Sequence, residues 1–527
     1  MDATAASTLG RRTGLAPSVL EWKWVVFSVL LLMWYLRSYY RSGLWCIPGP
    51  FLRSVSIIPR LVSVYRGASH KDDLDLHQKY GRIVRTAPNQ LSISDPDEIK
   101  RIYGTGTQFL KSPFYSLSEA HDEEGLIPDT FILKDMKKHT YMKRNAANAY
   151  AMHGLVQMEA CVEPVTERLL DILRVHTRQQ KAAPLDKLLK NYTMDAITAI
   201  TFGRDFDYLG KGDTLNLHRV GEIVAGYMAI FGQIAWTHKF LLEVPFIAKL
   251  VLPANGDADI FALVGHEIQH RREVKEESRT LTFLQRLLLN QQQHPEQLTN
   301  RDILTHAFGN LMAGSDTTAI AMQSVFLNIL KNPHVYHKLC AEIRSSLTSL
   351  PVTYTRANAL PYLGAVIKEA IRIHPSVGMM LARTVPADGA TLCGYKVPAG
   401  TEVGINPWVL HRDPAIFTDP DDFRPERWIA RNESDEEEQG HLRLMNRCFL
   451  AFGHGAHTCS GRWISLMETV KLVPTILLCF DLELADGASQ HSVLNRWFLF
   501  QTGINVRLVE RDVGPLVAAG TKGGVDA

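Results

Sequence analysis

The stretch FGHGAHTCSG, residues 452–461, places one cysteine among three glycines, two histidines and a phenylalanine. A lone cysteine is most often a small buried hydrophobic residue, and this is the alternative interpretation of Cys459. The sequence SGRWISLMETVKLVPTILLCF that follows has the apolar spacing of a helix, so Cys459 lies where a helix begins. Main-chain N–H groups and the helix dipole favour a thiolate there. A thiolate is the ligand that a soft metal centre needs.

The glycines of this stretch remove side chains where the backbone must approach something bulky and flat, and the phenylalanine supplies a ring to pack beside it. The order F-x-x-G-x-R/H-x-C-x-G is filled by Phe452, Gly455, His457, Cys459 and Gly461. This order resembles the heme-ligand loop of the cytochrome P-450 family. The resemblance implies that Cys459 is the axial ligand of the iron of heme b and that the other four residues belong to the cofactor site. A thiolate ligand favours cleavage of an iron-bound O–O bond.

A second motif, AGSDTT at residues 313–318, lies in a long helical stretch from Thr299 to Asn332. Thr299 and Asp302 can cap this helix. A mid-helix hydroxyl can bond back to a carbonyl and loosen the helix, and a kink without chemistry is the alternative interpretation. In the family this turn lies over the heme and holds dioxygen and water. By that resemblance Thr317 and Asp316 are catalytic, with Asp316 helping to relay protons.

The segments KEAIRIHP and FRPERW supply Glu369, Arg372 and Arg427. Glu369 and Arg372 are three residues apart on one helical face, a spacing that the expected surface pairs Glu98/Arg101 and Glu276/Arg279 share. Resemblance to the family distinguishes the first pair, because it implies that Glu369, Arg372 and Arg427 form a buried structural network. A buried charge needs such partners.

The segment HTYMKRNAANAY, residues 139–150, is similar to the family's helix that meets the heme propionates. His139 and Lys143 stand where the family often has tryptophan and arginine, and His457 replaces a common arginine. The resemblance implies that these residues and Arg383 bind the cofactor, although the two histidines can lose charge near neutral pH. The alternative for each is a solvated or core side chain.

The resemblance also implies a substrate pocket. Gly309, Asn310 and Ala313 lie on the long helix near the oxygen site, and Val377 and Met379 follow Arg372 at the offset where family members place side chains over the heme. Asn310 could fix one polar group of a largely hydrophobic ligand. The loop at residues 111–131 is expected to close the pocket. Core packing is the alternative for Val377 and Met379.

The composition agrees with a large globular protein. The chain has 527 residues, 46% of them apolar and 21% charged, and a formal net charge of +2 that gives no indication of nucleic-acid binding. Seven widely spaced cysteines argue against a disulfide scaffold. Helical patterns dominate, and RIVRTAPNQLSIS and TLCGYKVPAGTEVGI are strand-like. The expected fold is therefore the mainly α, minor β cytochrome P-450 fold, in one domain at residues 46–512, with a disordered tail at 513–527.

The N-terminal segment, residues 1–45, differs from the rest. Its stretch WKWVVFSVLLLMWYLRSYY, residues 22–40, is apolar and flanked by aromatic and basic residues, which predicts a single transmembrane anchor helix. The alternative, a cleaved signal peptide, would need a small-residue cleavage site. CIPGPF at residues 46–51 predicts a stiff elbow before the body. We expect an endoplasmic reticulum membrane protein whose catalytic domain faces the cytosol.

FLKSPFY, KRNAANAY and ISLMETVKLVP resemble fungal enzymes of the pisatin demethylase type. The resemblance implies a membrane-anchored, metal-binding oxidoreductase, a monooxygenase that inserts one atom of O2 into an apolar small molecule by hydroxylation, epoxidation or oxidative demethylation in secondary metabolite biosynthesis. An NADPH-cytochrome reductase, and with it cytochrome b5, would supply electrons near the basic residues Lys137, Lys138, Lys143 and Arg144. A heme-thiolate isomerase or dehydratase and a non-catalytic heme-binding protein are the alternatives. The sequence does not determine the substrate, the oxidised carbon, the number of oxidations or the oligomeric state.

Overall fold

The computed structural model describes residues 19–119, 121–122, 125–243, 256–273, 280–432, 434–485 and 490–512. The predicted tail at residues 513–527 and the expected surface pair Glu276/Arg279 lie outside these ranges. The predicted boundary between an N-terminal segment and a single domain stays a prediction.

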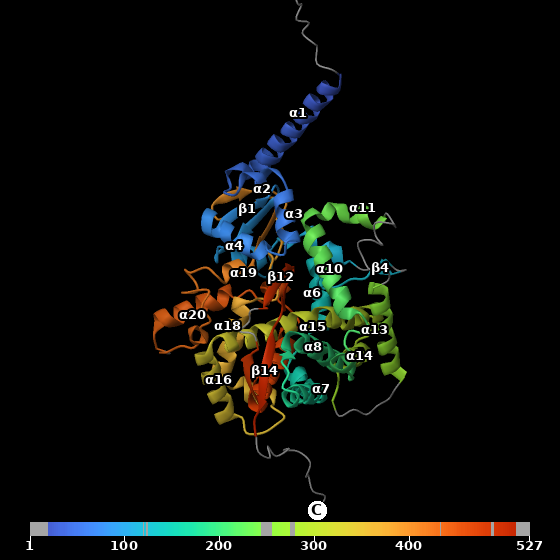
Figure 1. The fold of residues 1–527 in the computed structure, drawn as a ribbon. Helices are drawn as coiled ribbons and strands as arrows, with labels where there is room; N and C mark the ends of the chain where they lie inside the picture. Colours follow the sequence, from blue (N-terminus) through green and yellow to red (C-terminus); the bar gives the residue numbers. More distant parts are fainter. Residues whose placement is uncertain are drawn as a thin grey trace, which may run out of the picture.

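Helices make up most of the body, as the sequence predicts (Figure 1). The α-helices are α1 (Val19–Tyr40), α2 (Phe51–Val55), α3 (Ile58–Tyr65), α4 (Ser69–Tyr80), α5 (Glu98–Tyr103), α6 (Met136–Asn145), α7 (Met152–Arg178), α8 (Leu185–Phe202), α9 (Tyr208–Lys211), α10 (Leu217–Phe231), α11 (His238–Glu243), α13 (Gly256–Glu273), α14 (Phe283–Gln293), α15 (Asn300–Lys331), α16 (Pro333–Ser346), α17 (Tyr354–Asn358), α18 (Pro361–Ile373), α19 (Pro407–Leu410), α20 (Glu436–Cys448) and α21 (Arg462–Cys479). The 3-10 helices are η1 (Arg41–Cys46), η2 (Pro113–Ser118), η3 (Gly232–Thr237), η4 (Pro425–Trp428) and η5 (Gly455–His457).

The minor β part comprises small sheets. Its strands are β1 (Ile83–Ala87), β2 (Gln90–Ile93), β3 (Leu110–Lys111), β4 (His121–Asp122), β5 (Gly125–Leu126), β6 (Ala183–Pro184), β7 (Arg383–Thr384), β8 (Ala390–Leu392), β9 (Tyr395–Val397), β10 (Glu402–Ile405), β11 (Phe480–Leu484), β12 (Ser492–Arg496), β13 (Phe498–Thr502) and β14 (Asn505–Glu510). The largest sheet has the order β1-β2-β10-β7-β3, and β2 pairs antiparallel with β1 and parallel with β10. The strands expected at RIVRTAPNQLSIS and TLCGYKVPAGTEVGI are therefore present.

Helix α15 runs through the middle of the molecule and packs against α8, α18 and α21 (Figure 1). Its N-terminus has the predicted cap, because Thr299 and Asp302 each accept a hydrogen bond from the other's main-chain N–H. Gly314 lets α15 approach α8 closely, since a Cβ there would lie 2.9 Å from the side chain of Ile197. The largest apolar core surrounds these helices. One long helix thus fixes the centre of the fold.

Helix α1 contains the predicted anchor segment and projects from the body beside α2 (Figure 1). Its apolar side chains are exposed, among them Trp24 at 66% and Phe27 at 56%. Among the residues that the structure describes, no helix has both the length and the apolar character that crossing a membrane requires. The expected transmembrane anchor is therefore not supported.

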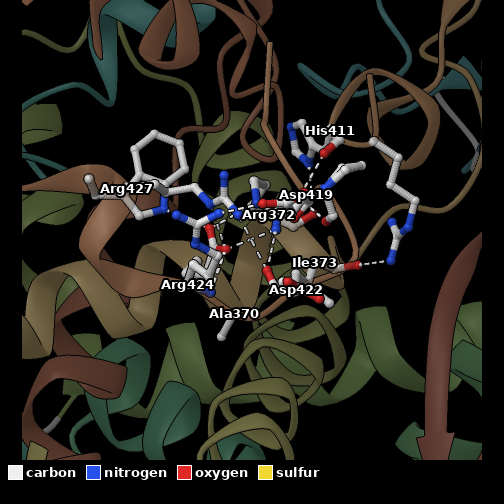
Figure 2. A network of polar contacts seen from close by, with 12 residues as sticks. Ala370, Arg372, Ile373, His411, Asp419, Asp422, Arg424 and Arg427 are labelled. Carbon is white, nitrogen blue, oxygen red and sulfur yellow. Dashed lines mark hydrogen bonds and ion pairs between the residues drawn. The ribbon is translucent and has the colours of Figure 1, made fainter. Parts of the chain in front are cut away.

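The predicted buried network forms around Glu369, which is fully buried on α18 (Figure 2). Arg372 donates to both carboxylate oxygens at 2.8 Å, and the Nε of Arg427 donates to Oε1 at 2.9 Å. The indole of Trp428 donates to Oε2 at 2.8 Å. Arg372 also donates to the carbonyls of His411 and Pro420. The carboxylate is thus surrounded by donors, as a buried charge requires.

His411 connects this network to the segment that leads into the cysteine loop. Its Nε2 accepts a hydrogen bond from the N–H of Leu450 at 3.0 Å, so its Nδ1 carries the proton that is donated to the carbonyl of Arg372. Burial and the charge of Arg372 lower the pKa of His411 to about 3, which keeps the ring neutral in this role. The sequence analysis did not identify His411.

We expect Arg372→Lys to lower the free energy of unfolding by about 3 kcal/mol or more, because lysine keeps the charge but cannot reproduce the fork of donors. The matched control is Arg101→Lys. Arg101 pairs with Glu98 at the same spacing on α5. Glu98 is buried, so the prediction of a surface pair is wrong for this residue, but the side chain of Arg101 is 53% exposed and the expected change is about 1 kcal/mol or less. Urea unfolding of both variants measures this difference, and equal losses would contradict the structural role of the network.

Candidate heme-thiolate site

The cysteine loop is a tight turn between α20 and α21 that carries η5 at its centre. The N–H of Cys459 donates to the carbonyl of Phe452 at 2.8 Å, which closes the loop. Gly453 and Gly455 have φ angles of +73° and +63°, where side chains are disfavoured. A Cβ on Gly455 would lie 2.0 Å from the carbonyl oxygen of Tyr103, so here the close approach is to the protein's own backbone.

Cys459 is exposed to an internal cavity of about 470 Å³, which it helps to line, and not at the outer surface. Burial raises the pKa of its thiol, while the N–H groups of Gly461 and Arg462 and the ammonium of Lys143 oppose this rise. The thiol pKa is therefore raised, whereas the position at a helix start alone predicts a lowered pKa. Desolvation outweighs the effect of the helix N-terminus. A thiol that coordinates a metal is deprotonated outright, so ligation would reverse this direction.

Cationic and imidazole side chains gather beside the loop. The rings of His139, on α6, and His457 lie 4.4 Å apart between centroids. Both ring nitrogens of His457, Nδ1 of His139 and Nε of Arg383 are buried without a hydrogen-bond partner among the described residues. Burial and the neighbouring cations lower the pKa of His139 to about 4 and that of His457 to about 2. An anion bound among these groups would raise the pKa values of the two histidines. It would also supply hydrogen-bond partners for the unpaired nitrogens.

Lys143 lines the cavity, and its part in binding the cofactor stays a prediction. Its ammonium donates to the main-chain carbonyls of Ala456 and Thr458 and so supports the cysteine loop directly. Lys111 also belongs to the cluster, since it lines the same cavity and its charge helps to lower the pKa of both histidines. Its ammonium donates to the carbonyls of Thr130 and Phe131. Burial and the charge of Arg383 lower the pKa of Lys111 to about 7. The sequence analysis missed Lys111 as a site residue, and β3 brings it beside Arg383 of β7.

The middle of α15 also lines the cavity. The hydroxyl of Thr317 donates to the carbonyl of Ala313 at 2.7 Å, which is the predicted back-bond. The carbonyl of Thr317 accepts a hydrogen bond from the hydroxyl of Ser376 at 2.8 Å. Ser376 follows α18, so this contact ties the loosened turn to the segment that carries Val377. The sequence analysis did not identify Ser376.

Asp316 also lines the cavity, although its carboxylate is buried against α8 and α10. Its Oδ1 lies 3.4 Å from the ammonium of Lys190 and 3.6 Å from Nδ1 of His218. Burial acts to raise the pKa of Asp316, but His218 and Lys190 outweigh it and hold the pKa below its usual value. Lys190 also pairs with Glu222, whose side chain is 56% exposed. Charged groups therefore extend from the cavity towards the surface.

The remaining predicted residues separate into two groups. The cavity is lined by Gly309, Asn310, Ala313, Val377, Phe452 and Gly461. Asn310 uses its amide within the protein, because its oxygen accepts from Tyr150 at 2.9 Å and its nitrogen donates to Thr201 at 3.3 Å. Met379 is buried in a core cluster and is not among the lining residues, so its alternative as a packing residue fits the structure.

A sequence profile described as Cytochrome P-450 matches residues 48–506. The chain belongs to the cytochrome P-450 family. It is 34% identical to the cytochrome P-450 monooxygenase cicH of Emericella nidulans over 481 residues, which cover 88% of this chain and 94% of that protein. It is 31% identical to a pisatin demethylase of Fusarium vanettenii over 466 residues, covering 86% and 88%. The family establishes this cytochrome P-450 as a monooxygenase that uses heme b, O2 and electrons from a reductase.

The residues present fit this cofactor. The thiol of Cys459 opens on the cavity, and unpaired donors of His139, His457 and Arg383 lie where the carboxylates of a heme would need partners. When bound there, heme activates O2, with a thiolate ligand that favours O–O cleavage. The protein supplies the sulfur, the donors and the shape of the cavity.

We expect Gly455→Ala to reduce heme content strongly, since the new methyl group would collide with the carbonyl of Tyr103 in a backbone conformation that alanine rarely adopts. The control is Gly364→Ala on α18, an exposed position where a Cβ meets nothing within 4 Å. Heme per protein, measured on the purified variants, provides the comparison. Normal heme content in Gly455→Ala would show that the loop does not depend on this close approach.

Proposed function

We propose that this cytochrome P-450 inserts one oxygen atom into a largely apolar small molecule, by hydroxylation, epoxidation or oxidative demethylation, in fungal secondary metabolism. One observation carries the proposal: Cys459 and the Thr317 turn line the same cavity. The named relatives are fungal monooxygenases, and one of them is a demethylase. The type of reaction and the pathway are inferred from this likeness.

The protein's own groups would guide protons to the oxygen site. The hydroxyl of Thr317 lies on the loosened turn, and Ser376 holds the carbonyl of that turn in place. Asp316, paired with Lys190, lies between this turn and exposed Glu222. A carboxylate that exchanges hydrogen bonds among these groups can pass protons on towards the oxygen site. The apolar remainder of the cavity would exclude bulk water from the reaction.

We expect Thr317→Ala to keep heme and ligand binding but to convert more of the NADPH consumed into hydrogen peroxide, because proton delivery is disturbed while the cavity survives. The assay uses the full chain with a NADPH-cytochrome reductase and tetralin as an apolar probe. The control is Thr177→Ala, which removes the same kind of back-bond, here to Leu173, from α7 outside the cavity. An unchanged peroxide yield in Thr317→Ala would contradict the relay.

The reductase would bind near the basic residues of α6, where Lys137, Lys138 and Arg144 are exposed. Cytochrome b5 could bind the same surface, because basic residues attract an acidic protein face. Lys143, the fourth predicted residue of this surface, also donates to two carbonyls of the cysteine loop.

We also propose that the protein associates with the endoplasmic reticulum membrane with its catalytic domain in the cytosol. Exposed apolar side chains on α1, α2 and α3, including Trp24, Phe51 and Tyr65, support contact with lipid.

We expect the exposed sequon at Asn432 to carry no glycan, because glycosylation occurs on the lumenal side. Glycosidase treatment of the native protein followed by mass measurement tests this topology. A mass decrease would place the domain in the lumen.

A further inference from the structure

One side of the cavity is an aromatic wall. Tyr115, Phe131, Trp497 and Phe498 all line the cavity. The ring centroids lie 5.2 Å apart between Tyr115 and Phe131 and 5.3 Å apart between Phe131 and Trp497. Trp497 and Phe498 stack at 4.8 Å with an interplanar angle of 24°. These spacings are those of favourable aromatic pairs, so the rings form one continuous surface.

Trp497 is held in this wall by an unusual backbone. It is the single residue between β12 and β13, and its φ of +72° is rare for a bulky side chain. Its N–H donates to the side-chain oxygen of Asn495, and its carbonyl accepts from the N–H of Gly378 at 2.9 Å. A strained conformation persists only where the surroundings determine it, and such conformations cluster at ligand sites. The hairpin therefore fixes the indole at the cavity.

The indole N–H of Trp497 has no acceptor among the described residues, although the residue is only 8% exposed. Trp497 lines the cavity, whereas Trp408 does not. Trp428, by comparison, donates to Glu369. A buried tryptophan N–H usually finds a partner, and the partner that fits here is a ligand acceptor.

We propose that the substrate is a flat aromatic compound carrying a neutral oxygen acceptor, such as a ketone or an ether. Its ring lies against the aromatic wall, and its oxygen accepts a hydrogen bond from Nε1 of Trp497. A neutral acceptor matches this neutral indole donor. The cations Lys111 and Arg383 lie over the ring of Tyr115, and Lys111 also lies over that of Phe131, but among the described residues no cation lies over the ring of Trp497. The inference rests on the proposed function in that it names the class of molecule that would be oxidised in the same cavity.

Three bicyclic probes separate the two parts of this recognition. 1-Tetralone has the aromatic ring and the carbonyl, tetralin has only the ring, and 1-decalone has only the carbonyl. We expect the full-length, heme-loaded protein to bind 1-tetralone about three- to tenfold more tightly than either of the others. Equilibrium dialysis measures the three dissociation constants without requiring turnover. Equal affinity for 1-tetralone and 1-decalone would overturn the aromatic preference.

The variants test the indole itself. Trp497→Phe should weaken 1-tetralone about three- to tenfold and leave tetralin unchanged, because the ring remains and the N–H is lost. Trp497→Leu should weaken both. Trp236→Leu, at a position 84% exposed and outside the cavity lining, should change neither. Unchanged 1-tetralone binding in Trp497→Phe would overturn the hydrogen bond.

The proposed function can fail separately from this inference. If the heme-loaded protein consumes no O2 with a reductase, the proposed function fails, while dialysis still ranks the probes. If Trp497→Leu does not fold, the wild-type ranking and Trp497→Phe, which keeps an aromatic ring, decide the outcome.

Discussion

The buried carboxylate of Glu369 is the interaction on which the rest of the site depends. It is fully buried, and leaving such a charge without partners would cost several kcal/mol, so the chain must deliver donors to it. Those donors come from α18 and from the segment at η4, two parts of the chain that are distant in sequence. Arg372 then binds the carbonyl of His411, whose ring holds the N–H of Leu450 just before the cysteine loop. The carboxylate thus determines where the loop begins.

Helix packing brings the Thr317 turn and the cysteine loop to the same cavity. Helix α15 packs directly on α18 and α21, the helices that precede the Ser376 segment and follow the cysteine loop. The hydrogen bond from Ser376 to Thr317 then fixes the loosened turn relative to that framework. The unpaired nitrogens of His139, His457 and Arg383 belong to the same cavity as the aromatic rings, and Arg383 lies over the ring of Tyr115.

Much of this could be predicted from the sequence, because some chemistry needs particular residues at fixed spacing. The cysteine loop, the cap of α15, the Thr317 back-bond and the Glu369 network are of this kind. Lys111, His411, Ser376 and Trp497 were missed because their roles arise from contacts between distant segments. Met379 was placed in the pocket by its offset from Arg372, yet the packing turns it into a core cluster. The thiol pKa of Cys459 shows the same limit, since burial cannot be judged from a helix start.

The central claim is that Cys459 supplies the thiolate ligand of a heme. Carbon monoxide binding to the reduced wild-type protein and to Cys459→Ala tests this most directly, because the absorption band of the complex reports the ligand opposite the gas. The account predicts the red-shifted band of thiolate ligation in the wild type and its loss in Cys459→Ala, since no other cysteine lines the cavity among the residues that the structure describes. The same red-shifted band in Cys459→Ala, or its absence from heme-loaded wild-type protein, would contradict the account.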